Sequence, residues 1–189
     1  MEIKSAVFIK GSPTINGVFE DGLPHVAFIG RSNVGKSSTI NALTKVKGLA
    51  KTSGSPGATK HLNMFLVNNK FYIVDLPGYG FVKGGSGRRD TLHDLIEDYL
   101  AYSYEGKQTI VLIIDAKVGP SNDDLDILEM LKGHGKNFIV AVNKIDRLKN
   151  AELKKQLTNI QSLLGGTKIL PYSALKKSKI AELLKEITA

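Results

Sequence analysis

Residues 30–37 constrain the fold of this chain more than any other stretch, because they read Gly-Arg-Ser-Asn-Val-Gly-Lys-Ser, the pattern of a phosphate-binding P-loop. An apolar run at 25–29 predicts a strand before them, and apolar residues at helical spacing predict a helix over 38–46 after them. A chance match of a glycine-containing loop is disfavoured by this strand–loop–helix context. Backbone N–H groups at a helix N-terminus point at an anion, and the helix dipole favours negative charge there. The pattern therefore predicts a nucleoside triphosphate site.

Each residue of this loop is a candidate nucleotide contact. Lys36 is expected to reach the β- and γ-phosphates, and the Ser37 hydroxyl is expected to ligate Mg²⁺. Two glycines allow backbone conformations that a Cβ would forbid. The candidate contacts in the loop are Gly30, Arg31, Ser32, Asn33, Val34, Gly35, Lys36 and Ser37.

The length and composition indicate one globular domain. The chain has 189 residues, of which 42% are hydrophobic and 23% are charged. Residues 1–24 are expected to form a strand and an arm packed on a domain over 25–189. There is no signal-peptide pattern and no apolar run of membrane-spanning length, which predicts a cytoplasmic protein without a membrane partner. The absence of cysteine excludes disulfides, thiolate catalysis and cysteine-type zinc sites.

The positive charge is concentrated in the last third of the chain. Residues 130–189 hold 12 lysines and arginines against 4 acidic residues, whereas residues 1–129 hold 14 of each, so the last third carries the net charge of +8. This asymmetry favours a surface that attracts phosphate backbones. A solvated, lysine-rich set of helix surfaces is the alternative.

Alternating strand and helix patterns predict a three-layer α/β fold of the P-loop NTPase type, with a mostly parallel sheet and one antiparallel edge hairpin. The hairpin joins 62–67 to 70–75 through two asparagines, which tolerate positive φ. The glycine-rich run 84–89 is expected to be mobile. The other expected strands are 3–9, 109–116, 137–142 and 168–172, and the other expected helices are 90–104, 122–134, 150–164 and 178–188.

Further motifs fall at expected strand ends, where ligands bind in such sheets. Asp75 can hold the Mg²⁺ shell through water, and the Gly78 N–H can meet the γ-phosphate. Leu76 and Pro77 between them complete this Asp-x-x-Gly segment, which by itself is a common turn. Its place after a P-loop and a hairpin favours the functional interpretation.

Residues 143–146 read Asn-Lys-Ile-Asp and follow a buried strand. The Asp146 carboxylate can accept two hydrogen bonds from the edge of guanine, whereas adenine offers neither donor, so the pattern indicates GTP or GDP. The contacts expected at this end of the nucleotide are Asn143, Lys144, Ile145, Asp146, Ser173 and Ala174, the last two by position only.

The long connection 48–61 lacks periodicity and is expected to be functional. Thr59 is its candidate second ligand to Mg²⁺, which would make the loop a sensor of the γ-phosphate. The alternative is that Thr59 is one loop hydroxyl among many.

Together these stretches resemble the EngB (YihA/YsxC-type) ribosome-assembly GTPases of the translation-factor-related class. The resemblance covers about residues 2–188. It is carried by Gly-Arg-Ser-Asn-Val-Gly-Lys-Ser-Ser at 30–38, Pro-Gly-x-Thr at 56–59, Asp-Leu-Pro-Gly-Tyr-Gly at 75–80, Ile-Glu-Asp-Tyr-Leu at 96–100, Asn-Lys-Ile-Asp at 143–146 and Ser-Ala-Leu at 173–175. It implies a Ras-like G domain and adds Gly57, Ala58, Thr59, Lys60 and His61 as expected nucleotide contacts.

The resemblance also implies a function. The expected protein is a Mg²⁺-dependent switch that hydrolyses GTP to GDP and phosphate and acts in assembly of the large ribosomal subunit. Its expected partners are a precursor of that subunit and its rRNA, without DNA, and a monomer is expected. The family is also linked to cell division and septum assembly.

Hydrolysis is expected to be slow without a partner. Tyr79 stands where Ras-like enzymes carry the glutamine that orients the attacking water. Lys36, Thr59, Gly78 and Asn33 are the candidate catalytic residues. The family resemblance suggests that Asn33 binds K⁺, and the alternative is an asparagine that stabilises the loop turn.

Two other functions stay open on the sequence alone. One is a GTP/GDP-dependent regulatory protein that binds a cell-division or signalling partner with negligible hydrolysis. The other is an ATPase, which requires that Asp146 does not select the base.

Overall fold

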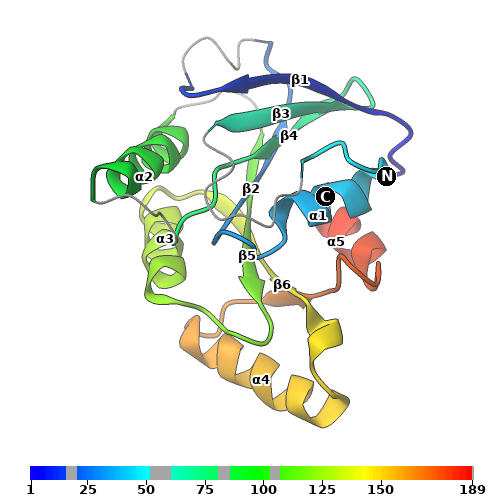
Figure 1. The fold of residues 1–189 in the computed structure, drawn as a ribbon, viewed down its shortest axis with the longest axis vertical. Helices are drawn as coiled ribbons and strands as arrows, with labels where there is room; N and C mark the ends of the chain where they lie inside the picture. The colour runs from blue at the N-terminus through cyan, green and yellow to red at the C-terminus, as the bar shows by residue number, and fades with distance from the viewer. Residues whose placement is uncertain (16–20, 52–60, 81–85, 103–106, 189) are drawn as a thin grey trace.

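The computed structural model describes residues 1–15, 21–51, 61–80, 86–102 and 107–188, and the side chains of 86–93 are not described (Figure 1). Its strands are β1 (Ala6–Ser12), β2 (His25–Gly30), β3 (Leu62–Val67), β4 (Phe71–Asp75), β5 (Gln108–Asp115), β6 (Asn137–Asn143) and β7 (Ile169–Pro171). Its helices are α1 (Lys36–Thr44), α2 (Ser86–Ala101), α3 (Asn122–Gly133), α4 (Asn150–Leu163) and α5 (Ile180–Ile187), with a 3₁₀ turn η1 (Ile145–Arg147).

The strands form one sheet in the order β1-β3-β4-β2-β5-β6-β7. Strands β4, β2, β5, β6 and β7 run parallel, and β3 is antiparallel to both of its neighbours. The predicted antiparallel hairpin is present as β3–β4, and its two turn residues, Asn68 and Asn69, have φ of 52° and 54°. Strand β1 pairs outside the hairpin and supplies the edge strand.

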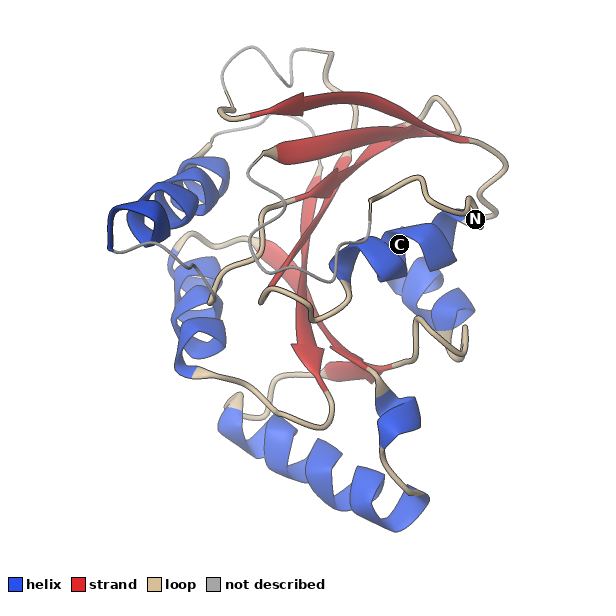
Figure 2. Ribbon diagram, viewed as in Figure 1, coloured by secondary structure: helices blue, strands red, loops and turns tan. Residues whose placement is uncertain are grey.

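Helices cover both faces of this sheet, which confirms the three-layer arrangement (Figure 2). Helices α2, α3 and α4 pack in one apolar cluster and α1 and α5 in the other. Strand β5 serves both clusters, because Ile110 and Leu112 face the first and Val111 and Ile113 face the second. A parallel strand buried on both faces explains its continuous apolar sequence.

Two elements, β1 and α2, differ from the sequence-based expectation by three residues or more. Strand β1 spans Ala6–Ser12, where 3–9 was expected, because its pairing with β3 sets its limits. Helix α2 begins at Ser86, so residues 86–89 of the run expected to be mobile are helical. The backbone hydrogen bonds of a sixteen-residue helix outweigh the weak helix propensity of one glycine. Residues 84 and 85 lie outside the described part.

The carboxyl ends of the parallel strands meet along one edge of the sheet, as a shared strand direction requires. The P-loop leaves β2 there, Asp75 ends β4, Asp115 ends β5 and Asn143 ends β6. Within the described ranges, no helix is both long and apolar enough to cross a membrane.

Candidate nucleotide-binding site

The P-loop connects β2 to α1 and requires glycine at both of its ends. A Cβ on Gly30 would lie 2.7 Å from the Ile113 carbonyl oxygen, and one on Gly35 would lie 2.4 Å from Asn143 Nδ2. Gly35 also has a φ of 107° and precedes the first residue of α1. Helix α1 has no acidic residue in its first turn, and no side chain of the described residues caps it. Its first backbone N–H groups are therefore available to an anion.

Lys36 lies within this loop and is nearly buried, with 8% of its surface exposed. Its ammonium donates to the carbonyl oxygens of Gly30, at 3.0 Å, and Arg31, at 3.4 Å. Burial lowers the pKa of Lys36, and the neighbouring Asp75 carboxylate opposes part of this shift. A buried cation of this kind is well placed to bind phosphate oxygens.

Ser37 and Asp75 form the part of the site that suits Mg²⁺. The Ser37 hydroxyl donates to Asp75 Oδ2 at 3.0 Å. Asp75 Oδ1 is buried and has no hydrogen-bond partner among the described residues. Burial raises the pKa of Asp75, although the Lys36 charge and the Ser37 hydroxyl oppose the shift.

These oxygens fit Mg²⁺ as it is bound in nucleotide sites. No group of three or more His, Asp or Glu gathers as a metal cluster in the described part of the chain. Mg²⁺ does not need one, because it is bound through one or two carboxylates together with substrate phosphates and water. The unpaired Asp75 oxygen and the adjacent hydroxyl supply the protein's share of such a shell.

Gly78 lies directly against the P-loop. A Cβ at Gly78 would lie 2.8 Å from Lys36 Nζ and 3.0 Å from the Ser32 backbone nitrogen. The Ser32 hydroxyl donates to the Gly78 carbonyl oxygen at 3.2 Å. Between Asp75 and Gly78, the backbone N–H of Leu76 donates to the Phe28 carbonyl oxygen at 3.1 Å, and Leu76 and Pro77 are buried.

Asn143 joins three loops by its side chain. Its amide nitrogen donates to the Val34 carbonyl oxygen at 3.0 Å, and its amide oxygen accepts from the N–H groups of Lys144, at 2.8 Å, and Ala174, at 3.1 Å. The residue is buried. The structure thus shows Asn143 connecting the P-loop, residues 143–146 and residues 173–174.

Lys144 makes a second connection across the site. Its ammonium donates to the Asn33 carbonyl oxygen at 2.7 Å and forms an ion pair with Asp115 at 2.7 Å. Asp115 also accepts from the N–H groups of Lys117 and Val118. Burial alone would raise the pKa of Asp115, but its bonds to Lys144 and to these N–H groups hold it below the usual value.

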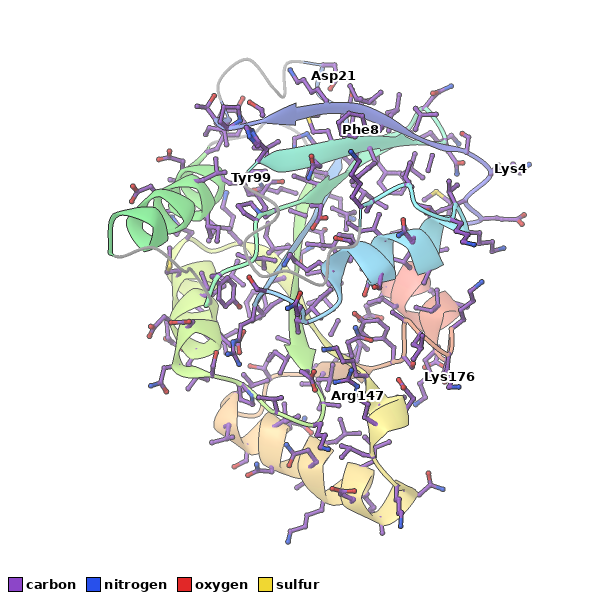
Figure 3. All side chains as sticks on the ribbon, in the orientation of Figure 1. Lys4, Phe8, Asp21, Tyr99, Arg147 and Lys176 are labelled. Atoms are coloured by element: carbon purple, nitrogen blue, oxygen red, sulfur yellow. The ribbon has the colours of Figure 1, made fainter. Side chains whose placement is uncertain are left out.

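Asp146 stands at the mouth of a pocket at the base end of the site. Its carboxylate is exposed and accepts a hydrogen bond from the hydroxyl of Ser173, which is buried. The Ser173 hydroxyl also accepts from the Lys176 N–H at 3.0 Å. Figure 3 places Arg147 and Lys176 beside the loops that follow β6 and β7.

The pocket has a volume of about 490 Å³, within the range of small-ligand sites. Its lining includes Gly35, Asn143, Lys144, Asp146 and Ala174. Ile145 belongs to η1, and its backbone N–H donates to the Tyr172 carbonyl oxygen at 3.4 Å. The pocket therefore joins the P-loop to the predicted base-recognition residues.

The structure brings together the predicted residues that it describes, except for one. His61 is exposed and lies just before β3, outside the contacts above. Gly57, Ala58, Thr59 and Lys60 lie outside the described residues, so their predicted roles stay predictions.

Sequence reasoning missed three features. Asp115 was treated only as part of an apolar strand, and its contact with Lys144 was not predicted. Its position at the carboxyl end of a parallel strand, where ligands bind in such sheets, could have marked it as a site residue. Asn143 was assigned only to the base, whereas its side chain connects loops. Tyr79 was noted for lacking a carboxamide, but nothing in the sequence indicated that its hydroxyl donates to Asp124, at 2.6 Å.

Comparisons with known proteins agree with this geometry. Residues 25–144 match the family described as 50S ribosome-binding GTPase, and residues 101–189 match the elongation factor Tu GTP binding domain. The chain is 44% identical over 190 residues to a probable GTP-binding protein EngB of Clostridium botulinum, covering 99% of this chain and 96% of that one.

Solved structures show the same fold. A crystal structure of a probable GTP-binding protein engB superposes with a TM-score of 0.70 at 25% identity, covering 87% of this chain and 96% of that chain. Era in complex with MgGDPNP and nucleotides of 16S ribosomal RNA superposes with a TM-score of 0.68 at 27% identity, covering 89% of this chain and 56% of that chain.

Proposed function

Because the chain belongs to the EngB family of P-loop GTPases, we propose that it is a Mg²⁺-dependent GTP switch that docks on a precursor of the large ribosomal subunit. One observation carries the nucleotide part of this proposal. A buried phosphate cradle with an unpaired carboxylate oxygen adjoins, at Gly35, a pocket whose lining includes Asp146.

Ser37 and Asp75 are the residues that would hold Mg²⁺, with Thr59 as the second hydroxyl ligand. When bound there, Mg²⁺ would supply positive charge that offsets the negative charge developing during phosphoryl transfer. Lys36 would add a second positive charge at the phosphates, and Gly78 packs against its ammonium. The solved Era relative was crystallised with MgGDPNP, which supports this assignment.

We propose slow intrinsic hydrolysis that a partner accelerates. Tyr79 lacks a carboxamide, and its hydroxyl is bound to Asp124, so it does not orient water as the Ras glutamine does.

A K⁺ ion is proposed to act at Asn33 in the P-loop. The side chain of Asn33 is exposed, and its backbone has a φ of 63°. Hydrolysis in KCl is expected to exceed that in NaCl, and equal rates would remove K⁺ from the mechanism.

The proposed partner surface is basic and includes α4. Its exposed face holds a shallow pocket of about 480 Å³ lined by Ala151, Lys154, Lys155, Thr158, Asn159 and Ser162. Lysines among small polar side chains suit the phosphate backbone of RNA. The proposed protein acts in the cytoplasm as a monomer, without DNA or membrane, and the family resemblance extends the proposal to cell division and septum assembly.

Cosedimentation with purified large subunits tests the partner. Binding is expected with a non-hydrolysable GTP analogue, to fall steeply with salt, and to be lost with GDP. Reversing Lys154 and Lys155 to glutamate should reduce the salt dependence of binding. Reversing two exposed lysines, Lys4 and Lys70, is the matched control. Figure 3 shows Lys4 away from α4, and the turn that holds Lys70 is hydrogen-bonded to residues 4 and 5. Nucleotide-independent binding, or none, would instead favour a regulatory protein with another partner.

A further inference from the structure

Tyr79 is held at both of its ends. Its carbonyl oxygen accepts from the Ser32 N–H at 2.8 Å, which ties the backbone to the P-loop. Its hydroxyl donates to Asp124 Oδ1 at 2.6 Å, which ties the side chain to α3. The side chain is only 2% exposed. Tyr79 therefore spans the distance between the phosphate cradle and a helix of the adjacent layer.

Asp124 is a rigid anchor for this hydroxyl. Its other oxygen, Oδ2, accepts from the N–H of Ser121, at 2.8 Å, and from its hydroxyl, at 2.7 Å. The Ser121 hydroxyl in turn accepts from the Asp124 N–H, which completes a capping box at the start of α3. The helix is fixed to the sheet by Ile127, Leu128 and Leu131, all buried in the apolar cluster.

In the proposed function, the backbone N–H of Gly78, the residue before Tyr79, meets the γ-phosphate. Gly78 packs on Ser32 and Lys36 without space for a Cβ. A peptide N–H contributes to binding only when it is held at hydrogen-bonding distance, so the position of Gly78 must be maintained by its neighbours. GDP has no γ-phosphate, and a displaced Gly78 therefore weakens binding of the triphosphate alone.

We propose that Tyr79 and Asp124 are positioning residues that hold Gly78 at the γ-phosphate, so that the preference for GTP over GDP depends on α3. This inference rests on the proposed function, since it requires a guanine nucleotide in the site. The Tyr79 side chain is buried, bonded to Asp124 of α3, and not part of the pocket lining. It acts through the backbone of its neighbour.

The test is Tyr79→Phe, which removes the hydroxyl and keeps the buried ring. We expect the Kd for a non-hydrolysable GTP analogue to rise about tenfold, the size of one hydrogen bond to a charged group. The Kd for GDP should stay within about twofold, because GDP does not contact Gly78. Both constants are measured by titration calorimetry on the full chain, and kcat and KM by phosphate release.

Tyr72→Phe is the matched control. The Tyr72 hydroxyl also donates to an aspartate, Asp21, at 2.6 Å, but it lies at the amino-terminal end of β4, away from the site. This variant should lose stability without changing the ratio of the two dissociation constants. Ser121→Ala removes one of the two bonds that hold Asp124 Oδ2, whereas the Ser121 N–H and the Tyr79–Asp124 bond remain. The Kd ratio in this variant should shift in the same direction as in Tyr79→Phe, but by less.

The outcomes distinguish the two proposals. An unchanged or lowered GTP-to-GDP Kd ratio in Tyr79→Phe, or equal weakening of both nucleotides, overturns the positioning role. Asp124→Ala, which removes both acceptor oxygens, must reproduce the shift of Tyr79→Phe, and failure to do so overturns the part assigned to α3. A wild-type chain that binds neither nucleotide contradicts the proposed function itself.

Discussion

The two ends of the nucleotide site are built in opposite ways. At the phosphate end, Lys36 and Asp75 are buried charged groups whose pKa values are displaced by burial in opposite directions. At the base end, Asp146 is exposed and the supporting loops are joined by Asn143. Phosphate recognition is therefore built into the core, whereas base recognition depends on loops that meet only in the folded chain.

This difference has consequences for stability. Buried charges reduce the stability of the protein alone, because they lose hydration that their partners replace only in part. Loop-joining amides act in the other direction, because each satisfied buried hydrogen bond stabilises the folded state. Removing a buried charge at the phosphate end should therefore raise the stability of the nucleotide-free protein, whereas removing a loop-joining amide at the base end should lower it. Four measurements test the contrast between the two ends.

The largest effect is expected at the base end. Asp146→Asn should change the preference from GTP toward XTP by about 10³-fold or more, because xanthine presents an acceptor where guanine presents a donor. Competition binding with GTP, XTP and ATP measures this change. Arg147→Gln, one residue further along the chain, is the control and should keep the GTP preference. A base preference that does not move in Asp146→Asn would support an ATPase.

At the phosphate end, Lys36→Ala should weaken binding of a GTP analogue about 100-fold, which corresponds to the loss of a buried charged contact of about 3 kcal/mol. Fluorescent-nucleotide titration gives the affinity. Lys70→Ala removes an exposed lysine in the turn between β3 and β4, outside the pocket lining, and should change it little. If both variants bind alike, Lys36 is not the phosphate ligand.

Asn143→Ala should reduce the free energy of unfolding by about 2–3 kcal/mol, because three buried backbone groups lose their partner. Urea denaturation without nucleotide measures this loss. Asn137→Ala is the control on the same strand, since its amide makes one bond, to Thr109, at the opposite end. Equal losses in the two variants would show that Asn143 does not join the loops.

The smallest effect is expected for Asp75→Asn, and it has the opposite sign. The pKa of Asp75 is raised by burial, so its contribution to stability is complete below the unfolded pKa and is lost as pH rises through the folded value. A neutral amide in place of the carboxylate avoids this loss, and the variant should be more stable by about 1 kcal/mol at neutral pH. The gain should vanish near pH ~4 in thermal unfolding scans. A variant less stable than wild type at neutral pH would contradict this account.

The sequence predicted most elements and the order of the motifs. Strong periodicity placed α3 at 122–134 and α4 at 150–164, and both helices lie within one residue of those limits. Strand β1 was displaced by three residues because its limits come from pairing with β3, a partner distant in sequence. Edge strands have few local signals, whereas buried parallel strands have many.

The residues of the candidate site likewise fall into those that local sequence specifies and those that contacts between distant segments specify. Lys36, Ser37 and Asp75 were identifiable because a local motif or a strand end specifies them. Asp115 and Asp124 were not, because their partners, Lys144 and Tyr79, are separated from them by 29 and 45 residues. Contacts of that kind arise only when strands and helices pack.

By itself, the sequence determined the P-loop and predicted that it holds a guanine nucleotide, since glycine, lysine and aspartate at fixed spacing have local physical requirements. Only the tertiary structure decided how the two ends of that site are connected: Asn143 and Lys144 join the base end to the P-loop, and Tyr79 joins the P-loop to α3. The physical reason is that hydrogen bonds between distant segments depend on the packing of the whole sheet, which no local pattern encodes.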